Sequence, residues 1–220
     1  TRQNILVGMA WLVKDAQPGD ALFFHFSGHG GQQEDPTCME EDCMDETILP
    51  VDFKRSGQIT DNEIFDILVA QLPAGCRLTA VMDCCHSGTG MDLPFTLYGH
   101  GGWGEDDNPA HSMGDVLLFS GCEDEDCSAD ASDRYGRAAG AMTSAFIDVL
   151  DKPTNRSFAS LIVELNHKLS RRGFSQRPQL TSSQRFDPNR PWDLITPVGN
   201  ANPTIGRHFR KKKSPRNPSM

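Results

Sequence analysis

A short apolar run that ends in reactive side chains places the strongest constraint on this sequence. Residues 77–83 are rich in β-compatible side chains, and the cluster Asp83-Cys84-Cys85-His86-Ser87-Gly88 overlaps their end. Such a run predicts a buried strand, and the glycine predicts a turn at the carboxyl end of that strand. A strand that delivers a cysteine to a turn is a suitable scaffold for a nucleophilic thiol.

A second apolar run is also followed by a turn that carries a reactive side chain. Ala21-Leu22-Phe23-Phe24-His25-Phe26 is nearly continuously apolar, which predicts a strand buried on both faces of a parallel sheet. The glycine-rich turn Ser27-Gly28-His29-Gly30-Gly31 follows it. Sites in open α/β sheets form at the carboxyl ends of strands, and neighbouring strands lie about 4.8 Å apart. If these two strands are neighbours, the His29 imidazole and a thiol from the second turn face each other.

The rest of the chain alternates between strand and helix patterns. Thr60 and Glu63 form a capping-box pattern, and Ser157 precedes an amphipathic run. Helices are expected at 4–14, from 60 to about 72, at 142–150 and after 157; strands at 47–51, 115–121 and 179–183; and loops at 32–46, 88–114 and 122–137. This alternation predicts an α/β domain with a mostly parallel central sheet flanked by helices on both faces.

Charge and cysteine content narrow the classes of partner and compartment. The formal net charge of -9 argues against nucleic acid as a partner and favours a cationic one, either a metal ion or a basic peptide. No apolar run is long enough to span a membrane. The seven cysteines contain no CxxC pair, so free thiols in a reducing, cytoplasmic compartment are expected rather than a disulfide framework or a zinc ribbon.

Strand alternation separates the members of the cysteine cluster. Asp83 and Cys85 share one face, whereas Cys84 lies on the other and is expected to be buried. His86 points away from its neighbour Cys85, so the expected catalytic partner is His29. Its position fits a histidine roughly 50 residues upstream of a nucleophilic cysteine. Taken singly, a buried cysteine or a histidine in a turn is usually structural. Their joint occurrence after two apolar strands favours a cysteine–histidine dyad.

The residues two positions before the dyad predict specificity. Asp83 precedes Cys85, and Ser27 precedes His29, so both are expected to line the pocket for the substrate side chain. A carboxylate there attracts Arg or Lys, which predicts cleavage after basic residues. The backbone N–H groups of Gly30 and Cys85 are the candidates for an oxyanion hole.

Together these segments resemble the metacaspases, a family of caspase-related cysteine peptidases. Further matching segments are 45–52, 120–122, 128–130, 140–143 and 177–183. The absence of a long insertion between the two halves implies a type I member, similar in its details to protozoan forms. The resemblance implies one caspase-like peptidase domain over 1–203, preceded in the family by a further strand and helix that carry another acid of the substrate pocket. The basic tail at 204–220 has no counterpart and is expected to be disordered.

The resemblance also implies an activity and a cofactor. It implies a calcium-activated endopeptidase that cleaves after Arg or Lys, with Ca²⁺ held by Asp45, Asp61, Asn62 and Asp92. Carboxylate and amide oxygens from separate loops suit this ion. Asn62 departs from the acid expected there, and a role in opening the capped helix would by itself account for Asp61 and Asn62.

Several alternatives remain at this level. The chain could be a catalytically silent scaffold that binds basic peptides in the same cleft, and it is expected to be a monomer. Self-cleavage is expected at basic loop sites, Lys54-Arg55 and 134–137. The acidic run 123–126 is a solvated face, a second cation site or a segment beside the substrate cleft. Cys38 with Cys43 is either incidental or metal-binding.

Overall fold

The computed structural model describes residues 1–35, 43–84, 87–99, 101–106, 109–121, 130–132, 138–152 and 154–199. Its helices are α1 (Arg2–Val13), α2 (Phe53–Ser56), α3 (Asp61–Ile64), the π-helix η1 (Phe65–Val69), α4 (Ala141–Leu150) and α5 (Phe158–Arg171). Its strands are β1 (Ala21–Ser27), β2 (Gly30–Glu34), β3 (Met44–Ile48), β4 (Ile59–Thr60), β5 (Arg77–Asp83), β6 (Phe95–Leu97), β7 (Trp103–Glu105), β8 (Asp115–Ser120), β9 (Asp130–Ser132), β10 (Ala138–Gly140) and β11 (Gln179–Ser182). The tail predicted at 204–220 lies outside the described residues, so the domain boundary at 203 stays a prediction.

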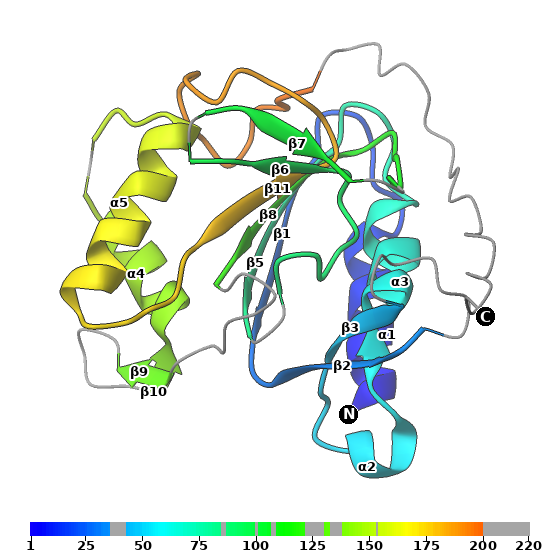
Figure 1. Ribbon diagram of the computed structural model, residues 1–220. Coiled ribbons are helices and arrows are strands. Elements are labelled where there is room, and N and C mark those ends of the chain that lie inside the picture. Colours follow the sequence, from blue (N-terminus) through cyan, green and yellow to red (C-terminus); the bar gives the residue numbers. More distant parts are fainter. Residues whose placement is uncertain are drawn as a thin grey trace, which may run out of the picture.

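A six-stranded sheet in the order β1-β5-β8-β11-β6-β7 forms the centre of the molecule (Figure 1). β1 pairs with β5 and β5 with β8 in parallel, whereas β11 runs antiparallel to both β8 and β6. β6 therefore runs in the direction of β1, β5 and β8, and most of the strands share one direction. The predicted α/β class with a mostly parallel sheet is confirmed.

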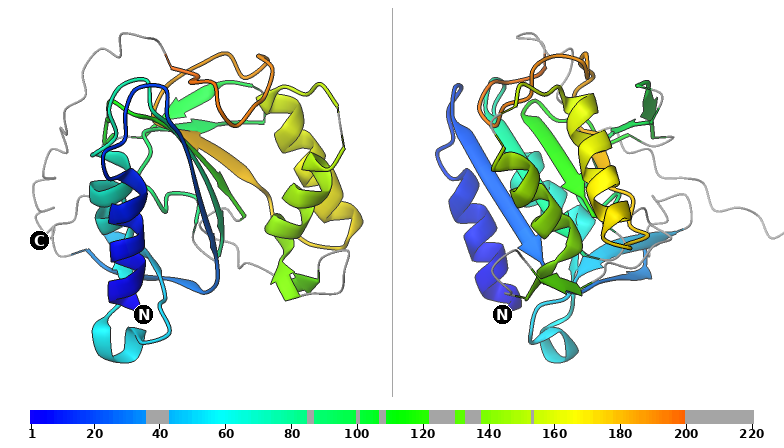
Figure 2. Two further views of the ribbon diagram at one scale, coloured as in Figure 1. Left: turned by 180° about the vertical axis from the view of Figure 1, so that it is seen from behind. Right: turned by 90° about the vertical axis from the view of Figure 1, so that its left-hand side faces the viewer.

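Helices cover both faces of this sheet (Figure 2). Side chains of β5 and β8 alternate between two cores. The core beneath α1, α3 and η1 takes Leu78, Ala80, Met82, Val116 and Leu118. The core beneath α4 and α5 takes Val81, Leu117 and Phe119. β5 is buried along its whole length, as expected for a strand sandwiched between helices.

The prediction that the strand at 21–26 is buried on both faces is wrong. β1 is the edge strand of the sheet, and its residues alternate between exposed and half-buried. Phe24 and Phe26 pack against the α1 side, but Phe23 on the opposite face is 49% exposed. The reason is that the core beneath α4 and α5 takes residues from β5, β8 and β11 and none from β1.

Two segments predicted to be loops contain strands. Within 32–46, β2 and β3 pair in an antiparallel fashion and β4 joins them in a small three-stranded sheet. Within 88–114, β6 and β7 extend the main sheet. Neither segment shows apolar alternation in its sequence. Local antiparallel pairing holds its short strands, and β11 and β4 add a further partner to β6 and β3. The strand predicted at 47–51 ends at Ile48.

The helix starts follow the sequence closely. Thr60 and Glu63 form the predicted capping box, and Ser157 caps α5. The first of these helices has only one α-helical turn before it continues as η1 to Val69. No helix of the described ranges is long and apolar enough to cross a membrane.

The cysteines agree only in part with the expectation of free thiols. Cys76 and Cys84 are buried, as predicted for Cys84, and neither is disulfide-bonded. Cys43 is disulfide-bonded, which contradicts the expectation of a free thiol at this position.

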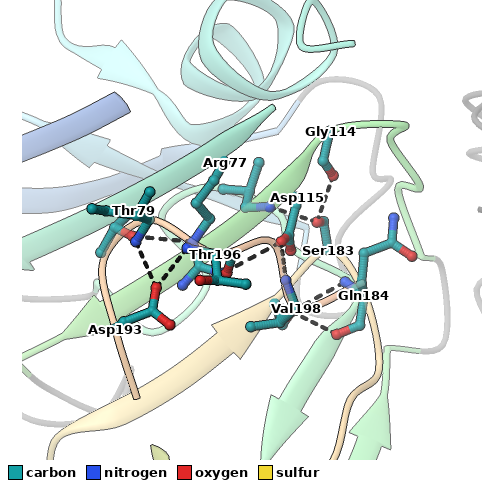
Figure 3. A network of polar contacts seen from close by, with 12 residues as sticks. Arg77, Thr79, Gly114, Asp115, Ser183, Gln184, Asp193, Thr196 and Val198 are labelled. Atoms are coloured by element: carbon teal, nitrogen blue, oxygen red, sulfur yellow. Dashed lines mark hydrogen bonds and ion pairs between the residues drawn. The ribbon is translucent and has the colours of Figure 1, made fainter. Parts of the chain in front are cut away.

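A buried ion pair fixes the amino ends of β5 and β8 (Figure 3). The fully buried Arg77 places its Nη1 3.3 Å from Asp115 Oδ2, and it also donates to the Thr196 carbonyl at 3.4 Å and to Thr79 Oγ1 at 3.1 Å. Asp115 accepts in turn from the Val198 N–H. Burial lowers the pKa of the Arg77 guanidinium, and Asp115 opposes that shift. The pair therefore joins two central strands to the segment that follows β11.

We expect the Asp115→Asn substitution to lower the free energy of unfolding by about 3–5 kcal/mol, because it removes the carboxylate that is hydrogen-bonded to the buried Arg77 charge. Urea denaturation measures this change. The matched control is Arg185→Gln, which removes an exposed pair with Glu105 and should cost less than about 1 kcal/mol. Equal effects of the two substitutions would contradict the role given to the buried pair.

Candidate active site

The parallel register of β1 and β5 brings the two predicted reactive turns to the same edge of the sheet. Ser27 stands directly opposite Asp83, and the Gly28 N–H donates to the Asp83 carbonyl at 3.4 Å. His29 follows Ser27 by two residues, as Cys85 follows Asp83 in the sequence. Cys85 and His86 lie outside the described residues, so their side chains are not placed. The chain leaves β1 and β5 toward both dyad positions from matching points.

His29 lies between the main sheet and the small one. Its side chain is exposed and forms no hydrogen bond with the described residues, while its carbonyl accepts from the Leu49 N–H at 2.9 Å. This bond makes His29 and Leu49 a hydrogen-bonded pair of the antiparallel ladder. Gly30 and Ile48 therefore form the next, non-hydrogen-bonded pair. The Gly30 N–H is directed away from β3, at the outer edge of the small sheet.

Asp83 is held at the amino end of α4. Its side chain is 1% exposed, and Oδ2 accepts from the Thr143 N–H at 2.6 Å. α4 begins after Gly140, which offers no side-chain cap, so Asp83 supplies the carboxylate that the helix start favours. A Cβ at Gly140 would lie 2.0 Å from Asp83 Oδ2, and one at Gly121 would lie 3.1 Å from Oδ1. Both glycines therefore make room for this carboxylate.

His25 is a neighbour of Asp83 that the sequence analysis did not single out. Its Nε2 lies 3.1 Å from Thr143 Oγ1, on the residue whose N–H binds Asp83. Burial lowers the pKa of the His25 imidazole, and the Asp83 charge opposes this shift. Strand alternation was the available signal, because residues 25 and 27 share a face of β1.

Three of the four predicted calcium residues lie together where β3 meets α3. Asn62 Nδ2 donates to Asp45 Oδ1 at 2.7 Å. The Asp61 carboxylate is fully buried and accepts from two backbone groups, the Glu46 N–H at 2.8 Å and the Asn62 N–H at 2.6 Å. These bonds show a structural role for Asp61, as the helix-start alternative predicted.

The fourth predicted residue, Asp92, lies in a turn that contacts the same strand. Its N–H donates to the Thr89 carbonyl at 2.7 Å, and Thr89 Oγ1 donates to Glu46 Oε2 at 2.8 Å. Glu46 also accepts from Gln32 Nε2 at 3.1 Å, so it joins β2, β3 and this turn. The sequence analysis missed Glu46; its place beside Asp45 in the motif was the only signal.

These side chains suit a hard cation in chemistry but are not arranged as a coordination shell. Asp45, Glu46, Asp61 and Asp92 are all buried and offer oxygen ligands of the kind that Ca²⁺ takes. Within the described ranges, no three His, Cys, Asp or Glu side chains form a group that could hold a metal ion as they stand.

Comparisons with known proteins agree with this geometry. The family model for the metacaspase peptidase C14 domain matches residues 1–94, which include both dyad positions. Metacaspase-2 of Trypanosoma brucei brucei is 43% identical over 208 residues, 88% of this chain and 60% of the relative. Metacaspase-5 of Trypanosoma cruzi is 41% identical over 212 residues, which are 90% of this chain and 48% of the relative. Metacaspase-1 of Yarrowia lipolytica is 40% identical over 236 residues, which are 86% of this chain and 50% of the relative.

This chain belongs to the metacaspase family. It spans about half to three fifths of the length of these curated metacaspases. Among solved structures, a Geobacter sulfurreducens protein superimposes with a TM-score of 0.62 over 90% of this chain and 79% of its own, at 24% identity. That likeness concerns the fold, and with the family it confirms the expected caspase-like arrangement.

The lowered pKa of His25 predicts a pH dependence of stability in this metacaspase. The unfolded state binds a proton at His25 more readily than the folded state, so the stabilising effect is present above about pH 6.5 and is lost as the pH falls through the folded pKa. His25→Gln should therefore reduce the loss of unfolding free energy between pH 7 and pH 5. Urea denaturation at several pH values measures this, and parallel curves for both proteins would refute it.

Proposed function

We propose that this metacaspase domain is a cysteine endopeptidase that cleaves after Arg or Lys, with Cys85 as the nucleophile and His29 as its base, and that calcium activates it. The observation that carries the proposal is the pairing of Ser27 with Asp83 on parallel β1 and β5. Both predicted dyad residues follow these partners by two positions, so the chain reaches them from one edge of the sheet.

In the proposed reaction, His29 acts as the base at this edge of the sheet. The imidazole takes the Cys85 proton, and the thiolate attacks the scissile carbonyl carbon. The outward-directed N–H of Gly30 is available to the oxyanion, together with the Cys85 N–H. Protonated His29 then gives its proton to the leaving amine, and water hydrolyses the thioester to regenerate the thiol.

Specificity for basic side chains is proposed to come from Asp83. Its buried carboxylate is oriented by the amino end of α4, and Ser27 lies opposite on β1. A cation that approaches a buried carboxylate is attracted more strongly than in water, because the local dielectric constant is lower. An acidic substrate side chain would be repelled by the same charge.

Hydrolysis of fluorogenic peptides tests this specificity. Peptides with Arg or Lys before the scissile bond should be cleaved, those with Asp should not, and Asp83→Asn should lower kcat/KM for Arg by about 100-fold or more, as loss of a buried charge pair implies. Preference for Asp, or full activity of Asp83→Asn, would refute the pocket.

The adjacent cysteines provide a matched pair for the nucleophile. Cys85→Ala should abolish turnover, whereas Cys84→Ala, which removes a buried thiol, should retain most of it. Mass spectrometry with a covalent inhibitor that carries Arg should show modification of Cys85 alone. Peptide binding without turnover or modification in the unaltered protein would identify a silent scaffold instead.

The buried carboxylates at β3, α3 and the turn at 87–92 support the proposed calcium site. Asp45, Asp61, Asn62 and Asp92 would supply its ligands, and Glu46 is positioned to assist. When bound, Ca²⁺ would neutralise these carboxylates and tie the three segments together next to the loop that follows β5. The contacts of Asp61 with backbone N–H groups leave Asp45 and Asp92 as the main expected ligands.

Calcium activation can be tested against a neighbouring acid. We expect chelation to abolish activity, and Asp45→Asn to raise the half-activating calcium concentration by about 10-fold or more, because one anionic ligand is lost. Asp66→Asn, which alters an exposed acid of η1, should leave that concentration unchanged. Isothermal titration calorimetry should likewise show weaker calcium binding by Asp45→Asn and unchanged calcium binding by Asp66→Asn. Activity that is equal with calcium and with chelator would contradict the proposal.

Self-cleavage stays part of the proposal. Lys54-Arg55 is exposed but lies in the short helix α2, not in a loop as predicted, and the second predicted site at 134–137 lies outside the described residues. Cleavage at Lys54-Arg55 therefore requires α2 to unwind. New termini found by mass spectrometry after calcium addition, and absent in Cys85→Ala, would support it.

A further inference from the structure

A basic cavity lies along α4 and α5, outside the candidate active site. Figures 1 and 2 show these two helices side by side over one face of the main sheet. The cavity has a volume of about 360 Å³. Its lining consists of Val149, Lys152, Thr154, Arg156, Glu164, His167, Lys168, Arg171 and Arg172. This size lies at the lower end of the range for small-molecule sites.

The cavity concentrates positive charge in an acidic protein. Five Lys and Arg side chains line it together with a single acid, Glu164, whereas the chain as a whole carries a formal net charge of -9. Lys168 and Arg172 both pair with Asp148, which lies just outside the lining. Lys152 and Arg171 are exposed and form no ion pair within the described part of the chain. Positive charge therefore remains in excess after every described ion pair is made.

Arg156 is a buried cation in the wall of this cavity. Its side chain is only 5% exposed, and its Nη2 lies 3.3 Å from Glu164 Oε2. Both terminal nitrogens approach the Lys152 carbonyl at 3.4 Å, the outer limit of a hydrogen bond. The Nε–H is buried and has no hydrogen-bond partner among the residues that the structure describes. A buried guanidinium with few good hydrogen bonds binds strongly to an anion that reaches it from the cavity.

We propose that this cavity binds a small anion with adjacent phosphoryl groups, such as a condensed phosphate. Guanidinium groups match phosphate oxygens in a planar fork, and several cations around one cavity favour a ligand that carries several charges. Val149 is the only aliphatic residue of the lining, and most of its polar groups are cationic. The small volume suits a small molecule better than an acidic peptide, which would need an extended groove.

Isothermal titration calorimetry with sodium tripolyphosphate tests this site. The Cys85→Ala protein in calcium-free buffer is used, so that neither peptidase activity nor calcium–phosphate complexes affect the result. One site per chain with a dissociation constant below about 1 mM is expected, with weaker binding at higher salt. Absence of binding at 1 mM would overturn the proposal and leave the peptidase proposal untouched.

Variants at the cavity rim locate the binding. The double variant Lys152→Gln/Arg171→Gln changes two exposed side chains and should fold normally; it should bind tripolyphosphate at least 10-fold more weakly. The control Lys14→Gln removes an exposed cation next to α1 and should bind like the parent. Arg156→Gln should abolish binding, with circular dichroism to check its fold. Equal binding by the double variant and the parent would overturn the assignment.

Two further titrations define the chemistry and source of the ligand. A hexa-aspartate peptide should bind at least 10-fold more weakly than tripolyphosphate, and tighter peptide binding would overturn the phosphoryl assignment. ATP and vesicles that contain phosphatidylinositol bisphosphate distinguish a soluble phosphate from a lipid headgroup. Binding to either, if lost in the double variant, supports the site and identifies its source.

Discussion

The parallel pairing of β1, β5 and β8 is the constraint on which the candidate active site depends. Parallel strands end at the same edge of a sheet, so a register that sets Ser27 opposite Asp83 also fixes where the two following turns begin. A slip by one residue would move Asp83 to the other face and away from α4. The buried Arg77–Asp115 pair secures the amino ends of β5 and β8, far along the strands from these turns.

Buried charge is handled in three different ways in this fold. Arg77 and Asp115 neutralise each other and bind backbone groups of the segment at 196–198. Asp83 has the amino end of a helix as its partner. Glu46 relies on amide and hydroxyl donors. In the last two arrangements the hydrogen bonds described come from neutral donors, next to the proposed substrate and calcium sites.

Charge is also segregated between the two ends of the α4 helix. Its amino end meets the Asp83 carboxylate, while its carboxyl end and the facing side of α5 carry the basic cavity. Arg172 lies close to both regions, since it donates to Ser144 Oγ at 3.0 Å, one residue from Thr143. Opposite charges on one helix suit two different classes of ligand on one small domain.

The sequence by itself determined the elements with strong local signals. The apolar runs located β1, β5 and β8, the capping patterns located the starts of α3 and α5, and alternation along β5 separated buried Cys84 from Asp83. The family motifs indicated the positions of the dyad and of the calcium residues, and Asp45, Asp61 and Asn62 do lie together. Each of these signals lies within a few neighbouring residues of the chain, so it can be recognised without knowledge of the fold.

Only the tertiary structure decided which surfaces are covered and which distant groups meet. The exposed face of β1 depends on where α4 and α5 pack, and β6 joins the main sheet through β11, which lies far along the chain. The roles of Gly140, Thr143 and His25 around Asp83 follow from a helix start about 60 residues further along the chain. The basic cavity likewise has no linear motif. Long-range packing, which local periodicity does not encode, created each of these features.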